Sequence, residues 1–102
     1  MKLRVEKSFE KDVDRVSDKK LLRKLRTLIS TIEDADMIRE IPAIKKIEGY
    51  KTYYRVKIGD YRLGMEAVSS REVTLLRFLH RKDIYRYFPK GGRVGTLTDI
   101  IR

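Results

Sequence analysis

The chain contains no cysteine and no tryptophan, and its 102 residues include a single histidine, His80, and two prolines. The absence of cysteine excludes a disulfide scaffold, a thiol nucleophile and a cysteine-ligated metal site, and it fits a reducing compartment. One histidine also excludes a zinc site built from several histidines. No apolar run approaches the roughly 18 residues of a transmembrane helix, and the N-terminus lacks a signal-peptide stretch. We therefore expect a small, soluble, cytoplasmic domain without a membrane partner.

Positive charge is in clear excess. Lys and Arg number 25 against 15 Asp and Glu, which gives a net charge of +10. Apolar residues make up 41%, too many for a disordered chain, so this charge belongs to a folded surface. Residues 1–49 carry 13 basic and 10 acidic side chains, whereas residues 50–93 carry 11 and 4. The second half therefore predicts a phosphate-binding face, the alternative being a surface that is only solvated.

The first half predicts one strand and two helices. Alternating apolar residues over 2–7 are typical of a strand. Ser8 is expected to cap a first helix, and Ser17-Asp18 a second one that carries an apolar stripe. The opposite face of the second helix carries five cations, which are Lys19, Lys20, Arg23, Lys24 and Arg26. The short joint between the helices predicts an antiparallel hairpin, followed by a connection over residues 33–42 and a solvated loop at Lys45-Lys46.

The second half changes to a period of two, which is typical of strands. Strands are predicted over residues 53–58, 61–68 and 72–79, with Gly59-Asp60 as a type II′ hairpin turn. Residues 72–79 are apolar on both faces, which predicts a central strand. A closing helix over residues 81–88 is stopped by Pro89. The expected fold is therefore α+β, in the order β-α-α-β-β-β-α: an antiparallel sheet packed against an N-terminal helical hairpin, with a short C-terminal helix.

Cations gather on one face of this expected sheet. Arg55 and Lys57 alternate with apolar residues, and Arg62 joins them across the turn, with Glu66 as the neighbouring carboxylate. Three further cations follow the last strand, and three tyrosines are interleaved with them: Arg81, Lys82 and Arg86, with Tyr61, Tyr85 and Tyr87. Such a surface suits RNA, because cations bind phosphates and rings stack on unpaired bases. The alternative is that these cations only solvate an exposed sheet.

Two other groups of residues have competing interpretations. His80 is the side chain that ordinarily titrates nearest neutral pH, which permits a role as acid or base, but a lone histidine at a strand end also serves as a structural hydrogen-bonding group. Tyr50, Tyr53 and Tyr54 are expected to pack against the sheet.

Two stretches resemble a known family. Residues 54–64 (YRVKIGDYRLG) resemble the strand–turn–strand signature of RelE-type toxins in the RelE/ParE superfamily, and residues 78–86 (FLHRKDIYR) resemble its closing segment. The expected element order agrees with that family. The resemblance predicts a RelE-like toxin domain over residues 1–89 and a flexible C-terminal tail over residues 90–102.

The resemblance implies a function. RelE toxins are metal-independent endoribonucleases that cut mRNA in the ribosomal A site, and a cognate antitoxin protein inhibits them. No cofactor is implied. The family's basic sheet positions match Arg55 and Lys57. Its arginine after the hairpin turn matches Arg62, and its arginine at the end of the last strand matches Arg81. Its C-terminal tyrosine matches Tyr85. The first of these positions is often lysine in relatives, and arginine is a poor general base.

Our mechanistic hypothesis assigns catalysis to Lys57, Arg62, Arg81 and Tyr85. Lys57 acts as base, the two arginines hold and stabilise the reacting phosphate, and Tyr85 stacks on a base or assists proton transfer. Substrate binding is assigned to a second set, which is Arg55, Tyr61, His80, Lys82 and Arg86. Two alternatives remain: a ParE-like inhibitor of DNA gyrase, and a module that binds RNA or ribosomes without efficient cleavage.

Overall fold

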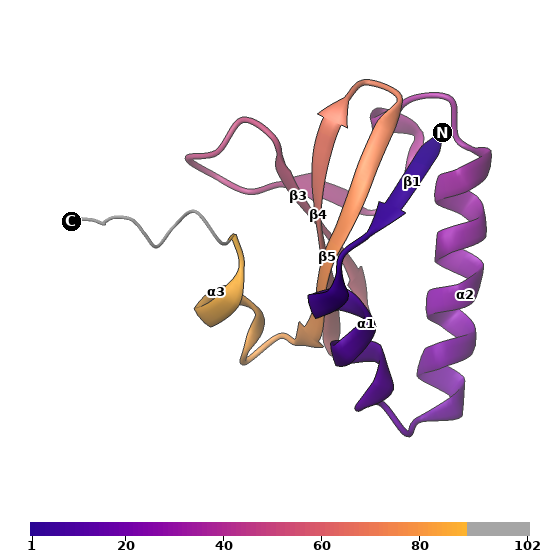
Figure 1. The fold of residues 1–102 in the computed structure, drawn as a ribbon, viewed down its shortest axis with the longest axis vertical. Helices are drawn as coiled ribbons and strands as arrows, with labels where there is room; N and C mark the ends of the chain where they lie inside the picture. Colours follow the sequence, from indigo (N-terminus) through magenta and orange to yellow (C-terminus); the bar gives the residue numbers. More distant parts are fainter. Residues whose placement is uncertain (90–102) are drawn as a thin grey trace.

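The computed structural model describes residues 1–89, so the tail predicted over residues 90–102 lies outside the described part of the chain (Figure 1). The elements in chain order are β1 (Lys2–Val5), α1 (Lys7–Asp14), α2 (Lys19–Asp34), the 3-10 helix η1 (Ile38–Glu40), β2 (Ile44–Lys46), β3 (Tyr53–Ile58), β4 (Tyr61–Ser69), β5 (Glu72–His80) and α3 (Ile84–Tyr87). The predicted α+β class, with its helical hairpin and short C-terminal helix, is confirmed. No helix in the described residues is long and apolar enough to cross a membrane.

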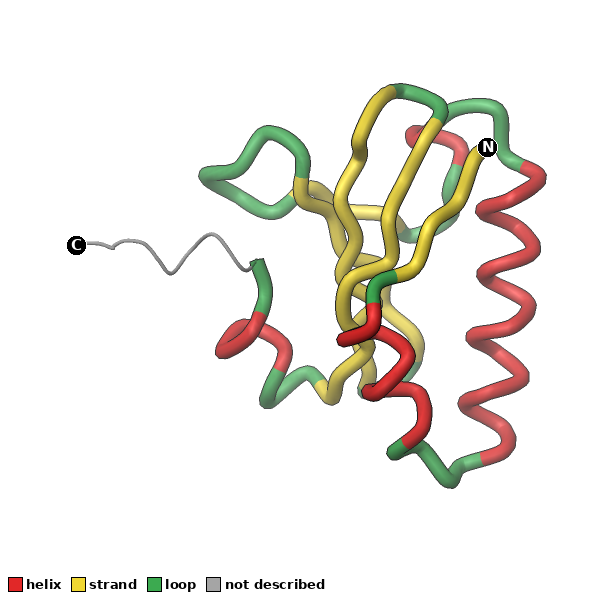
Figure 2. Tube along the Cα trace, viewed as in Figure 1, coloured by secondary structure: helices red, strands yellow, loops and turns green. Residues whose placement is uncertain are grey.

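The sheet has five strands in the order β1-β5-β4-β3-β2 and is mixed (Figure 2). The prediction of an antiparallel sheet is wrong for β1, which pairs in parallel with β5 so that Leu3 lies opposite Val73. The central strand is β4, not the predicted β5. β2 is a three-residue edge strand where a loop was expected, with Lys45 opposite Arg55. So short a strand leaves no recognisable period in the sequence.

Two layers of side chains cover the two faces of the sheet. The main core lies between the sheet and the helical hairpin, and it includes Leu25, Ile32, Leu63 and Leu75. A smaller cluster lies on the other face, where α3 buries Ile84 against the sheet. In Figure 1, α2 and α3 stand on opposite sides of the sheet. One face is therefore closed by helices, while the other is covered by α3 at one place.

The start of α2 follows the prediction, but the start of α1 does not. Asp18 Oδ1 accepts hydrogen bonds from the backbone N–H groups of Lys20 and Leu21 at 3.0 and 3.2 Å, as an N-cap does. Ser8 lies inside α1, which has Glu6 at its N-cap position. The Ser8 hydroxyl instead donates to the carbonyl of Leu76 at 2.6 Å.

The hydrogen bond from Ser8 to β5 is one of the contacts by which α1 covers the free edge of that strand. β1 pairs with β5 only as far as Leu75, so the next part of the β5 edge needs other partners. α1 supplies them: Ser8 binds the Leu76 carbonyl, and the Asp12 carboxylate accepts from the backbone N–H of Phe78 at 2.9 Å. The side chain of Ser8 is thus used for β5 and not for capping.

Asp12 also forms a buried ion pair. Its two carboxylate oxygens accept from Nε and Nη2 of Arg77 at 2.7 and 3.0 Å. Asp12 is only 3% exposed. This carboxylate therefore connects α1 to both the backbone and a side chain of β5.

The closing helix is shorter than predicted and spans Ile84–Tyr87. The residues before it are held in turns, because the N–H of Arg81 donates to the carbonyl of Asp60 at 2.7 Å and that of Asp83 to His80 at 2.8 Å. After the helix, Phe88 is 2% exposed and packs in the smaller cluster. α3 is therefore anchored by its apolar side while its polar side faces outward.

The packing of Phe88 requires glycine at position 64. A Cβ atom on Gly64 would lie 2.9 Å from three atoms of the Phe88 ring. We expect Gly64→Ala to lower the free energy of unfolding by about 1–3 kcal/mol and to speed hydrogen exchange in α3. Urea unfolding and amide exchange measure these effects. In a Phe88→Ala background the same substitution should cost little, and an equal cost in both backgrounds would contradict this explanation.

Candidate functional site

Four cations share the face of the sheet on which α3 packs. We call Arg55, Lys57, Arg62 and Arg77 the basic sheet face. Lys57 lies directly opposite Arg62 on neighbouring strands, and Arg55 and Arg77 both lie opposite Gly64. Like charges at directly opposed positions destabilise a sheet. The opposed pair of Lys57 and Arg62 therefore indicates an anionic ligand, whereas Arg77 is held by the Asp12 carboxylate and lies over the Tyr87 ring.

The β3–β4 turn orients Arg62. Gly59 has a φ of +57° and stands first in a two-residue turn, in agreement with the predicted type II′ geometry. The Arg62 Nη1 donates to the carbonyls of Gly59 and Tyr61 at 3.0 and 2.9 Å. The guanidinium is therefore held over the turn, and within residues 1–89 its remaining N–H groups have no acceptor.

Arg81 is brought to the same end of the sheet. Its backbone N–H binds Asp60, the second residue of the turn, and its Nε lies 3.9 Å from Asp60 Oδ1. The side chain is 59% exposed, so this ion pair is weak and open to competition by another anion. The fold thus gathers Lys57, Arg62 and Arg81 around one turn, although Arg81 is distant from the other two in sequence.

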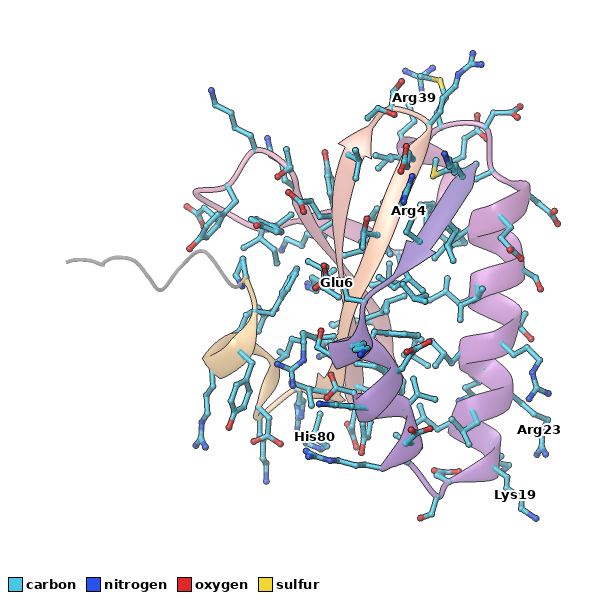
Figure 3. The ribbon with its side chains drawn as sticks, in the orientation of Figure 1. Arg4, Glu6, Lys19, Arg23, Arg39 and His80 are labelled. Carbon is cyan, nitrogen blue, oxygen red and sulfur yellow. The ribbon has the colours of Figure 1, made fainter. Side chains whose placement is uncertain are left out.

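Tyr61 and His80 lie on the other face. The Tyr61 ring stacks on Phe78 with centroids 5.0 Å apart and meets the His80 ring edge-on at 5.7 Å. Nδ1 of His80 accepts from the backbone N–H of Lys82 at 3.1 Å. Figure 3 shows His80 at the end of the sheet near the turn. The structure therefore does not bring these two rings together with the basic sheet face, because strand alternation turns both toward the helices.

The remaining predicted residues lie on α3 or just before it. Tyr85 is 57% exposed on α3, and within residues 1–89 it makes no hydrogen bond or ring contact. Lys82 and Arg86 are also exposed. Glu66, the expected partner of the cations, instead accepts from the Thr52 hydroxyl at 3.4 Å and lies opposite Tyr53. The cations around the turn are therefore not neutralised by this carboxylate.

Arg77 is a cation on this face of the sheet that the sequence analysis did not single out. The register between β4 and β5 shifts so that Leu76 is an extra residue on β5, and such bulges redirect the neighbouring side chains. The Arg77 guanidinium lies 5.1 Å from the centroid of the Tyr87 ring, a cation–π contact. The only available signal was one arginine between the apolar residues Leu76 and Phe78 of β5, and its partner Asp12 is 65 residues away in sequence.

Tyr53 links the sheet to α3. Its ring meets those of Tyr50 and Phe88 edge-on at 5.5 and 5.6 Å, and Tyr54 packs against the main core. The prediction that these tyrosines pack on the sheet is confirmed. Burial raises the pKa of the Tyr53 phenol, with smaller contributions from the negative charge of Glu66 and from Tyr50 and Glu6.

This raised pKa predicts a loss of stability in alkali. The folded state holds the phenolic proton more tightly than the unfolded state, so the contribution of Tyr53 is complete below the ordinary pKa of 10.0 and is lost as pH rises through the folded value. Urea unfolding at pH 8 and at pH 10.5 should show a smaller alkaline loss in Tyr53→Phe than in the wild type. Tyr85→Phe, a change at an exposed ring, should leave the alkaline loss unchanged; equal losses in all three proteins would refute the assignment.

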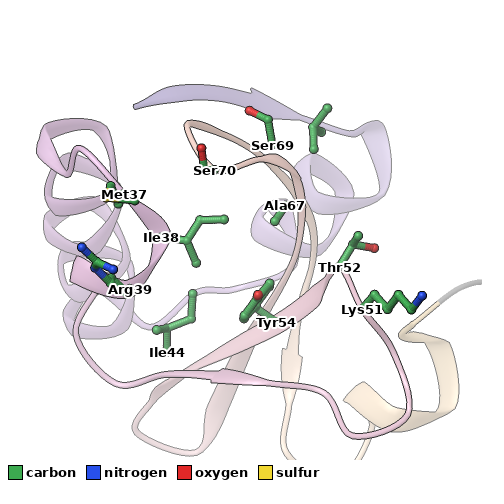
Figure 4. Close-up of a pocket in the computed structure, with 11 residues that line it drawn as sticks. Met37, Ile38, Arg39, Ile44, Lys51, Thr52, Tyr54, Ala67, Ser69 and Ser70 are labelled. Atoms are coloured by element: carbon green, nitrogen blue, oxygen red, sulfur yellow. The ribbon is translucent and has the colours of Figure 1, made fainter.

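A groove of about 720 Å³ lies elsewhere, between η1, β2 and the ends of β3 and β4 (Figure 4). Its apolar lining includes Ile38, Ile44, Tyr54 and Ala67, and none of the predicted site residues. The predicted site residues are instead all exposed or half-buried on the surface. Exposed cations on an open surface suit a polymer better than a small molecule, whose sites are concave. Within residues 1–89 no three His, Asp or Glu side chains gather closely enough to hold a metal ion.

Known proteins resemble this chain in both sequence and fold. A family model described as the ParE toxin of the type II toxin-antitoxin system parDE matches residues 3–85. Toxin RelE3 of Methanocaldococcus jannaschii is 37% identical over 90 residues, which cover 87% of this chain and 100% of that protein.

Two solved structures have the same fold. The RelB-RelE antitoxin-toxin complex from Methanococcus jannaschii contains a chain that is 34% identical, with a TM-score of 0.71, over 84% of this chain and 99% of that one. A RelE-RelB complex from Pyrococcus horikoshii OT3 gives 22% identity and a TM-score of 0.62 over 78% and 93%. This chain therefore belongs to the RelE/ParE family of toxins from type II toxin-antitoxin systems.

Proposed function

We propose that this toxin is an endoribonuclease that cuts mRNA in the ribosomal A site. The observation that carries the proposal is the meeting of Lys57, Arg62 and Arg81 around the β3–β4 turn. Three cations close to one turn can supply the positive charge that a phosphate needs as negative charge develops during cleavage. Family membership supports the proposal, since the resemblance to RelE-type toxins already implied it.

The proposed reaction is an attack within the RNA strand. The 2′-oxygen of one nucleotide attacks the adjacent phosphorus, Lys57 takes the 2′-hydroxyl proton, and the bond from phosphorus to the 5′-oxygen breaks. Arg62 and Arg81 stabilise the dianionic phosphorane, and Tyr85 gives a proton to the departing 5′-oxygen. The products are a 2′,3′-cyclic phosphate and a 5′-hydroxyl. Arg55 holds a neighbouring phosphate in this scheme.

Positioning by the ribosome completes the scheme. The side chains that line the turn are exposed or half-buried, so this open surface does not enclose a substrate by itself. An mRNA already held in the A site arrives with its phosphate oriented, which replaces part of the entropy cost of alignment. Cleavage is therefore expected to require translation.

The proposed partner is a cognate antitoxin protein. The M. jannaschii relative is described in a complex of RelE with RelB. An acidic or amphipathic segment would complement the charge of this toxin. We propose that the antitoxin covers the basic sheet face or displaces α3.

The test is primer extension on an mRNA in a translating extract to which the purified toxin is added. Cuts should arise within codons of the translated message and be absent from the same mRNA without ribosomes. An intact message would refute the nuclease proposal. In that case a supercoiling assay with purified gyrase would test the alternative, a ParE-like inhibitor of DNA gyrase. The description of the matching family as a ParE toxin favours this alternative.

A further inference from the structure

A second basic surface lies on α2, on the far side of the molecule from the basic sheet face. We call it the α2 ridge, and it consists of Lys19, Lys20, Arg23, Lys24 and Arg26, all of which are exposed. Figure 3 shows Lys19 and Arg23 pointing away from the sheet. The main core lies between this helix and the sheet, so the two basic surfaces face in opposite directions.

The charges of the α2 ridge oppose the stability of the helix. α2 has no acidic residue in its first turn and no basic residue in its last turn, whereas the helix dipole favours the reverse. Lys19 lies four residues before Arg23, and Lys20 four before Lys24, so like charges repel along the helix surface. Within residues 1–89 the ion pairs join Arg4 to Glu72, Arg77 to Asp12 and Arg81 to Asp60.

The five cations of the α2 ridge therefore have no carboxylate partner in the described part of the chain. An arrangement that costs stability and is not compensated internally indicates a partner outside the chain. The partner must be anionic, and its charges must be spaced closely enough to meet several cations along one short stretch of helix.

The neighbouring side chains indicate which polyanion this is. The exposed face of α2 beside the ridge continues with Thr27 and Ser30 and offers no aromatic ring on which a single-stranded base could stack. The apolar side chains that border the ridge, Leu22 and Ile29, are half-buried, whereas a helix that lies in a bilayer needs a broad exposed apolar face. Cations four residues apart rise about 6 Å along a helix, so the ridge presents a compact row of charges. Double-helical RNA is recognised through its backbone in this way.

We propose that the α2 ridge binds the phosphates of a double-helical RNA segment while the basic sheet face holds the mRNA strand. The proposal rests on the proposed nuclease function and adds a second RNA contact to it. Because the two surfaces face opposite directions, a single mRNA strand does not fill both. The toxin is then held between two RNA segments of the ribosome, and the α2 ridge contributes to affinity and orientation without taking part in the reaction.

The experiment compares two variants with the same loss of charge. One carries Lys20→Gln, Arg23→Gln and Lys24→Gln on the α2 ridge. The matched control carries Arg39→Gln, Lys46→Gln and Lys51→Gln, which are exposed on other elements. Binding to purified ribosomes is measured at several salt concentrations, in an Arg62→Ala background so that no cleavage occurs. Urea unfolding checks both variants, and the ridge variant should be at least as stable as its parent because it loses repulsive charges.

We expect the ridge variant to bind ribosomes at least ten-fold more weakly, with a shallower dependence on salt. The control variant should bind ribosomes within about three-fold of its parent, because salt screens the attraction between distant surface charges. Equal losses in the two variants would overturn the inference, since net charge would then explain the binding. Antitoxin binding is measured in parallel, and a loss there as large as the loss on ribosomes would identify the ridge as a protein contact and overturn the inference too.

The failure of this inference is distinct from the failure of the proposed function. If the wild-type toxin cuts translated mRNA but the ridge variant binds ribosomes normally, the nuclease proposal stands and the ridge proposal is wrong. If the wild type leaves mRNA intact yet ribosome binding depends on the ridge, the RNA contact is supported while the nuclease proposal fails.

Discussion

Replacing Arg62 by alanine is expected to slow mRNA cleavage on the ribosome by about 10²–10³-fold. Arg62 is held over the turn by two backbone carbonyls, so in the proposed reaction its charge is held in place before the phosphorane forms. Its removal takes away charge stabilisation that needs no reorganisation during the reaction. The measurement is single-turnover cleavage of mRNA on programmed ribosomes at saturating toxin, which separates the chemical step from binding.

Two further variants test whether the loss of cleavage is specific to the Arg62 side chain. Arg71→Ala removes the same charge from the turn between β4 and β5, at the opposite end of β4, and should leave the rate within a factor of about three. Arg62→Lys keeps the charge but loses the planar fork of donors, so it should fall between the wild type and alanine. If Arg62→Ala and Arg71→Ala cleaved at similar rates, the turn would not be the catalytic centre.

Replacing Asp12 by alanine is expected to lower the free energy of unfolding by about 3–5 kcal/mol. The substitution leaves Arg77, whose side chain is 19% exposed, without its carboxylate partner. It also leaves the backbone N–H of Phe78 without an acceptor at the uncovered edge of β5. Urea unfolding followed by circular dichroism measures the change.

The control on the same helix is Asp14→Ala. Asp14 is exposed, and surface changes of this kind usually alter stability by no more than about 0.5 kcal/mol. The double variant Asp12→Leu with Arg77→Leu should cost less than Asp12→Ala alone, because it leaves no buried charge unpaired. A cost below about 1 kcal/mol for Asp12→Ala would contradict the role given to this ion pair.

The Asp12–Arg77 ion pair also links the stability of the fold to the position of the predicted site residues on α3. Arg77 contacts the Tyr87 ring on α3, the same short helix that carries Tyr85 and Arg86. α3 is further held by Phe88 over Gly64. The position of the predicted C-terminal site residues therefore depends on contacts that lie on the sheet, outside the motif that contains them.

Some features were accessible from the sequence because they depend on neighbouring residues. The alternation over residues 53–58 predicted β3 with both ends correct, and Gly59-Asp60 predicted the hairpin turn. The cap at Asp18 was also predicted, since its partners are two and three residues away. These features bring Arg55, Lys57 and Arg62 onto one face, so most of the basic sheet face follows from local rules.

Other features depend on contacts between distant parts of the chain, which local patterns do not report. The parallel pairing of β1 with β5, the use of Ser8 on β5 and the Asp12–Arg77 ion pair join residues more than 60 positions apart. The bulge at Leu76 and the approach of Arg81 to Asp60 depend likewise on how the strands meet. A periodic pattern reports which face of an element is buried, but not which distant element covers it. Local sequence patterns therefore specify a basic α+β domain with cations on one sheet face, whereas tertiary packing sets how those cations lie relative to one another and to α3.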